Sequence, residues 1–187
     1  PLSTQTPPIS GSCNVSSDVT AKSGTWTSGT KLSYQWLRGG KANKGATAST
    51  YKLRGADAGQ KVSVKVTDTR TGYTTATKAS AGKRVAKGTL TTKTPTISGS
   101  LIVGSTFIAR LGTSAAGTSL RNQWQRDAPA IKGATASTLP HSSDHAWYKL
   151  PVKVICTNKY YTNETKASSG KTGAPNPLTT NNQTAPC

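Results

Sequence analysis

The segment "HSSDH" at 141–145 gathers the residues best suited to chemistry, because it places His141, Asp144 and His145 within five positions. Two imidazoles and a carboxylate are ligands that transition metals accept. Their spacing is looser than that of established metal-binding motifs. We therefore expect polar residues of a surface turn with no bound metal or other cofactor, and keep these three residues only as candidate ligands.

Catalysis has little support in the sequence. General acid–base and nucleophilic mechanisms need paired carboxylates, or a histidine beside a nucleophile. The 187 residues include only 6 Asp and Glu, and neither "GxSxG" nor "HExxH" occurs. No glycine-rich segment has the strand–helix context of a phosphate-binding loop. We expect a protein that is not an enzyme.

Aromatic side chains are better candidates for binding, since they can stack on sugars or bases. Trp147 and Tyr148 follow "HSSDH", and Tyr160 and Tyr161 fall at the tip of a predicted hairpin. Packing against a neighbouring domain is the alternative role for all four. Binding and packing therefore stay open for them at this point.

The charge of the chain indicates an anionic partner. Lys and Arg number 24 against 6 Asp and Glu, a formal net charge of +18. Residues 1–88 hold 14 basic and 3 acidic residues and the remainder 10 and 3, so the charge is spread along the chain. An anionic cell-wall polymer or polysaccharide is a natural partner, and nucleic acid is expected to bind only non-specifically. A surface that is basic only for solubility is the alternative.

Membrane insertion is not expected. No apolar run approaches the ~20 residues that cross a bilayer. The chain also begins without a basic and then apolar leader.

The phrase "KGATAST" stands at 44–50 and again at 132–138, an offset of 88 residues. Sliding the chain by that offset aligns 2–86 with 90–174 without a gap, and about half of the positions match. Such self-similarity indicates a duplicated unit. We expect one domain over 1–88, a second over 89–177, and a tail over 178–187 that resembles the start of a third repeat.

Alternation in the sequence indicates strands. "KVSVKV" at 61–66 and "LPVKVIC" at 150–156 place apolar residues at every second position. Gly, Pro or Asn interrupts the chain at short intervals, and no helical pattern of useful length occurs. These features predict an all-β fold, a sandwich or barrel, with Trp36 and Trp124 in the core.

A family resemblance narrows this expectation. "YQW…TYKLRGADAGQKVSVKV" resembles the immunoglobulin pattern of a core Trp followed by a D-x-G turn, without the usual disulfide. "PTISGSLIVGSTF" and "TGYTTATKAS" are similar to tandem immunoglobulin-like repeats of secreted and surface proteins of actinobacteria. The resemblance implies two tandem immunoglobulin-like β-sandwiches. It also implies that Asp57, in the D-x-G turn, caps backbone amides.

Three cysteines leave one thiol unpaired or available to another chain. In immunoglobulin-like domains joined end to end, Cys13 and Cys156 are expected at facing ends of the two domains. We predict a disulfide between them, and a Cys156–Cys187 bond is the alternative. Cys187 then provides a free or intermolecular thiol on the tail, and the chain could form a homo-oligomer through that tail.

The function expected from these observations is that of a non-catalytic extracellular protein. It would be a structural or adhesive element at a cell or particle surface, with its basic surface docked on an anionic polymer. A carbohydrate-binding module is one alternative. A filament subunit, or a viral decoration or tail subunit that assembles head to tail, is another. The partners of the chain would then be other protein subunits.

Overall fold

A computed structural model describes residues 4–177 of the chain. The regular structure of these residues is almost entirely β, with two short 3-10 helices. The chain divides into two compact units. The first runs to Thr89 and includes Lys159–Thr162, and the second consists of Leu90–Asn158 and the chain from Asn163 onward. Each unit is described by itself below.

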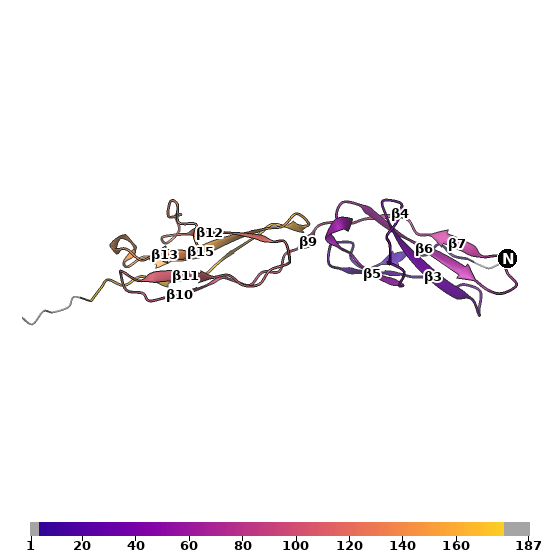
Figure 1. Ribbon diagram of the computed structural model, residues 1–187, viewed down its shortest axis with the longest axis horizontal. Coiled ribbons are helices and arrows are strands. Elements are labelled where there is room, and N and C mark those ends of the chain that lie inside the picture. Colours follow the sequence, from indigo (N-terminus) through magenta and orange to yellow (C-terminus); the bar gives the residue numbers. More distant parts are fainter. Residues whose placement is uncertain (1–3, 178–187) are drawn as a thin grey trace, which may run out of the picture. The chain divides into compact units, whose positions relative to one another are not determined.

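The first unit has two antiparallel sheets, which form two layers (Figure 1). One sheet consists of β1 (Ile9–Ser10), β2 (Asp18–Ala21) and β5 (Thr50–Lys52), in that order. The other consists of β4 (Lys41–Ala42), β3 (Lys31–Arg38), β6 (Lys61–Thr69) and β7 (Ala76–Ala79), with β8 (Lys83–Arg84) paired to β6. The 3-10 helix η1 (Gly55–Asp57) connects β5 to β6. β9 (Gly88–Thr89) pairs in parallel with β16 (Tyr161–Thr162).

The core of the first unit lies between these layers, as the alternation predicts. Val62, Val64 and Val66 of β6 are at most 3% exposed, while the intervening side chains of the strand are less buried. Trp36 of β3 is fully buried and stacks on Tyr51 of β5, with ring centroids 5.6 Å apart. Burial of such a ring is worth about 3–5 kcal/mol when judged by its replacement with Ala.

The repeated phrase "KGATAST" anchors the core tryptophan in each unit. In the first unit the indole Nε1 of Trp36 donates to the carbonyl of Ala48 at 2.9 Å. In the second, Trp124 donates in the same way to Ala136 at 3.0 Å. Gly45 supplies the left-handed residue that the turn needs, with φ of 81°. The phrase is therefore a structural connection that satisfies a buried polar group.

The second unit repeats the arrangement with two three-stranded sheets, again in two layers (Figure 1). One consists of β10 (Thr96–Ser98), β11 (Thr106–Arg110) and β13 (Thr138–Pro140), and the other of β12 (Ser119–Trp124), β15 (Val152–Thr157) and β17 (Glu164–Ala167). β14 (Lys149–Leu150) pairs with β18 (Lys171–Thr172), and the 3-10 helix η2 (Ser143–His145) follows β13. Phe107, Trp124 and Val152 are fully buried between the layers.

Two layers of antiparallel strands around a central buried tryptophan define the fold class. The chain forms two tandem immunoglobulin-like β-sandwich domains. This confirms the fold class that the sequence predicts.

Candidate functional site: an aromatic and basic surface on the second unit

The corner that follows β5 in the first unit is closed by a buried carboxylate. Asp57 is fully buried, and its Oδ1 accepts from Nε of Arg38 at 2.5 Å. Its Oδ2 accepts from the hydroxyl of Tyr51 at 2.8 Å and from the backbone N–H of Arg54 at 2.7 Å. Asp57 therefore caps a backbone amide, as expected, and also pairs with a cation. The hydrogen bond between Arg38 and Asp57 raises the pKa of Arg38. Burial is the main cause that raises the pKa of Tyr51, and its hydrogen bond to Asp57 is the second.

The same corner is open in the second unit because the partners have been replaced. At the offset of 88, His145 stands in place of Asp57 and Leu139 in place of Tyr51, whereas Arg126 retains the arginine. Its guanidinium instead donates from Nη1 to the carbonyl of Asp144 at 3.2 Å. It also lies over the ring of Tyr148, 5.0 Å from the centroid. A positive charge that is held in an ion pair with a buried carboxylate in the first unit thus faces an aromatic ring here.

A groove of about 270 Å³ opens beside this arginine. The groove is lined by Arg126, Pro129, Ala130, Ile131, Lys132, Asp144 and His145. Partial burial of the ring lowers the pKa of His145 below its usual 6.5. The Nδ1 atom of His145 lies 3.4 Å from the hydroxyl of Ser142. The groove therefore combines two cations, one carboxylate and a histidine that is more often neutral than a free one.

Trp147 is the most exposed large apolar side chain among the described residues, with 75% of its surface accessible. It has φ of 70°, in the left-handed region that costs a non-glycine residue about 1–2 kcal/mol. Its position matches Gly59 of the first unit, whose φ is 77°. The backbone N–H of Trp147 donates to the carbonyl of Gly173 at 2.9 Å, which fixes the main chain while the indole projects outward.

A second glycine has been replaced in the same way close by. Asp127 has φ of 53°, where the matching Gly39 has 54°. Its Oδ1 accepts from the backbone N–H of Lys149 at 2.9 Å. Two of the three non-glycine residues with positive φ in the described chain thus lie next to Arg126 and Tyr148 in the sequence. Such strain concentrates at functional sites because the folded structure must hold it in place.

The metal-binding hypothesis is not supported among residues 4–177, where no group of three potential ligands is close enough to hold an ion. The expectation of surface-turn residues is wrong for His141, which is 2% exposed. The physical reason is its position, because it replaces the core residue Leu53. Its ring lies 4.9 Å from that of Phe107, and neither ring nitrogen has a hydrogen-bond partner among the described residues.

Tyr160 and Tyr161 belong to the first unit. Both are half-buried and pack against the core of the first unit. The ring of Tyr160 lies against Gly55, where any side chain would collide with it. The hydroxyl of Tyr161 lies 2.6 Å from Oγ of Ser16. Trp147 and Tyr148 therefore belong to the second unit, and Tyr160 and Tyr161 to the first.

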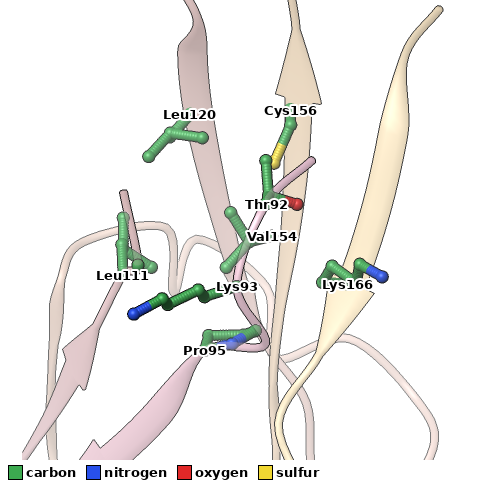
Figure 2. A pocket seen from close by; sticks show the side chains of 9 residues that line it. Thr92, Lys93, Pro95, Leu111, Leu120, Val154, Cys156 and Lys166 are labelled. Carbon is green, nitrogen blue, oxygen red and sulfur yellow. The ribbon is translucent and has the colours of Figure 1, made fainter. Parts of the chain in front are cut away.

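The cysteines are free thiols where the structure describes them. Cys13 is half-buried in the first unit, and Cys156 is 1% exposed in the second. Figure 2 shows the Cys156 sulfur beside Thr92 and Val154, in a cavity of about 10 Å³. The Cys13–Cys156 bond stays a prediction, for which peptide mapping under non-reducing conditions is the check. Cys187 lies outside the described residues.

The lining of this cavity is mainly apolar. Figure 2 shows the amino group of Lys166 directed away from the other labelled side chains. Leu111, Leu120 and Pro95 complete its apolar wall. The cavity is therefore a packing gap of about one water molecule's size.

Comparison with known proteins gives likeness in fold. No protein-family model matches the chain, and no curated protein sequence matches it. A solved structure of the three N-terminal domains of the highly immunogenic outer capsid protein (Hoc) of bacteriophage RB49 is 15% identical, covers 87% of this chain, and has a TM-score of 0.38. The chain spans 58% of the length of that structure.

Two further solved structures consist of tandem or paired immunoglobulin domains. The IG1 and IG2 domains of DIP-gamma are 14% identical, with 92% of this chain and 98% of that one covered and a TM-score of 0.31. The amphioxus IgVJ-C2 molecule is 13% identical, with 75% of this chain and 88% of that one covered and a TM-score of 0.32.

None of the described residues forms a helix long and apolar enough to cross a membrane.

Proposed function

We propose that the chain is a non-catalytic extracellular protein of a cell or particle surface, and that its second unit binds an anionic polysaccharide. The proposal includes the kinship with actinobacterial surface repeats that its sequence phrases indicate. The carrying observation is Trp147, an indole that is 75% exposed on a strained but hydrogen-bonded main chain. An indole that is three-quarters exposed, yet stands where the first unit has a glycine, is best explained by a ligand.

The chemistry around Trp147 fits a charged sugar chain. Indole and phenol rings offer flat apolar faces to the C–H groups of sugar rings. Arg126 presents a planar guanidinium suited to carboxylate, sulfate or phosphate, and Lys132 lines the same groove. Asp144 also lines the groove, and the carboxylate of Asp127, the residue after Arg126, accepts a backbone hydrogen bond from Lys149. The net charge of +18 attracts any polyanion, and the aromatic residues select a sugar.

Three polymers that share the dextran backbone but differ in charge can separate binding through charge from binding through sugar recognition. We expect dextran sulfate and carboxymethyl dextran to bind in calorimetric titrations at ~0.15 M salt, and neutral dextran to bind weakly or not at all. Double-stranded DNA serves as the competitor without sugar rings exposed for stacking, and its binding should disappear near ~0.2 M salt. Equal retention of DNA and dextran sulfate at that salt concentration would reduce the interaction to charge alone and defeat the proposal.

The repeat supplies a matched pair of lysines as an internal control. Lys132 lines the groove, and Lys44 occupies the same place in "KGATAST" of the first unit. Lys132→Ala should weaken binding and reduce the slope of log K against log salt by about one. Lys44→Ala removes the same charge elsewhere and should leave both unchanged. Equal effects of the two substitutions would mean that the polymer does not distinguish the two units.

A further inference from the structure

The first unit contains a receiving surface that is occupied by Lys159–Thr162. The backbone N–H of Gly88 donates to the carbonyl of Tyr160 at 3.0 Å, and β9 and β16 pair in parallel beyond it. The hydroxyl of Tyr161 lies 2.6 Å from Oγ of Ser16. The segment therefore contacts the first unit at Ser16 and Gly88, and the neighbouring Val15 is only 3% exposed.

The repeat places an equivalent surface on the second unit, at an offset of 88 residues. Leu101 and Ile102 match Cys13 and Asn14, and they are 40% and 41% exposed. The matching residues of the first unit, Cys13 and Asn14, are half-buried with Lys159–Thr162 in place, and they are less apolar. The second unit thus exposes more apolar residues at the place where the first unit is covered. Exposed neighbouring apolar residues of this kind indicate an interaction surface.

The repeat also supplies the segment that fits such a surface. Thr71–Thr74 of the first unit matches Lys159–Thr162, and Tyr73 occupies the position of Tyr161. Tyr73 is 47% exposed, and its contact within the unit is with the guanidinium of Arg70, 4.9 Å from the ring centroid. A tyrosine that is half-buried in one copy of the repeat is therefore presented to solvent in the other.

The steric differences between the copies compensate each other. In the first unit Gly55 has no side chain, and the ring of Tyr160 fills that space. In the second unit the receiving residue is Ser143, and the residue that would approach it is Gly72. The first contact pairs a large residue of the tip with a glycine of the surface. The second would pair a glycine of the tip with a larger residue of the surface. Such a reciprocal exchange preserves the space between two surfaces.

We propose that the Thr71–Thr74 tip of one copy of this chain docks on the Leu101–Gly104 surface of a second copy. The contact joins two different surfaces, so repetition produces rings or open filaments and not closed two-fold dimers. Gly104 replaces Ser16, so Tyr73 lacks the hydroxyl partner of Tyr161, and Asn176 stands where Gly88 leaves space for the ring. The proposed contact is accordingly weaker than the one that Lys159–Thr162 makes in the first unit. Association through it therefore depends on the protein concentration. It does not depend on the proposed polysaccharide binding.

Complementary variants test this proposal by sedimentation velocity over a concentration series, with reductant present to exclude disulfide-linked species. Tyr73→Asp destroys the tip but leaves the receiving surface, and Ile102→Asp does the reverse. Each variant alone should remain monomeric where the native chain associates. An equimolar mixture should form dimers and nothing larger, because only one intact tip and one intact surface can meet.

Controls distinguish this contact from other associations. Ile155→Asp changes another apolar residue, 38% exposed, and should leave association as in the native chain. Trp147→Ala should also leave it unchanged, which separates it from polysaccharide binding. Melting curves confirm that each variant is folded. Association that persists in both single variants, a native chain that stays monomeric at millimolar concentration, or a mixture that stays monomeric would each overturn the proposal.

Discussion

Trp147 holds the left-handed backbone conformation that Gly59 holds 88 residues earlier, with φ of 70° against 77°. The glycine adopts this conformation without steric cost, whereas the tryptophan does not. Its indole recovers little of that cost by burial, because 75% of it is exposed. The second unit therefore retains a destabilising residue at its surface.

Trp147→Gly is expected to stabilise the second unit by about 1 kcal/mol, because it removes the left-handed strain. The greater chain entropy of glycine in the unfolded state offsets part of the gain. Urea denaturation followed by circular dichroism measures the change. The same variant should lose polysaccharide binding, so stability and function should move in opposite directions. A less stable variant would show that the indole has a packing role.

His141→Leu is expected to raise the free energy of unfolding by about 1–3 kcal/mol, because two buried ring nitrogens without partners are removed. Leucine is the residue that the first unit carries at this position, as Leu53. Thermal melts of the native chain and the variant measure the shift. The reciprocal substitution, Leu53→His, should destabilise the first unit. Loss of stability in His141→Leu would mean that the imidazole makes an interaction that the fold needs.

Asp57→Ala should cost the first unit about 3 kcal/mol, because it removes the partner of a partly buried cation and leaves the Tyr51 hydroxyl without its acceptor. Denaturation curves measure the change. His145→Ala, at the matching position of the second unit, is the control and should cost much less, since His145 closes no such network. Equal costs for both substitutions would contradict the distinction between a closed and an open corner.

Acid should destabilise the second unit in part through His145. Partial burial lowers the pKa of this residue in the folded state below its ordinary 6.5. As the pH falls below 6.5 the unfolded chain takes up the proton first, so the free energy of unfolding declines until the folded state is protonated as well. Well above pH 7 neither state is protonated, and the residue adds no pH dependence. Native chain and His145→Gln should therefore show a difference in stability that changes between neutral and acidic pH, and a constant difference would contradict the assignment.

The sequence predicts the fold well because duplication and alternation are both local signals. The valines of "KVSVKV" and the two core tryptophans lie where a strand period of two places them. The capping role of Asp57 follows from its place in a D-x-G turn. The charge partner Arg38 is 19 residues away in the sequence and is visible only in the folded chain.

The site was harder to predict because its signals are differences between the copies. "HSSDH" looks like a polar turn, yet alignment with Leu53 would have indicated that His141 enters the core. The replacement of Gly59 by Trp147 was equally visible in the alignment, and it is the clearest signal of the exposed surface. The release of Arg126 was not, because it depends on losing the counterparts of Tyr51 in β5 and Asp57 in η1, whose contacts with Arg38 only the folded chain shows. That Lys159–Thr162 belongs to the first unit likewise needs the three-dimensional structure.

The most direct test of the central claim is a calorimetric titration of dextran sulfate into the native chain, Trp147→Ala and Trp147→Phe at ~0.15 M salt. An aromatic ring that stacks on a ligand contributes about 1–3 kcal/mol. We predict an affinity at least about tenfold lower for Trp147→Ala and largely restored for Trp147→Phe, with unchanged net charge in both. Equal affinity of the native chain and a folded Trp147→Ala variant would contradict the account.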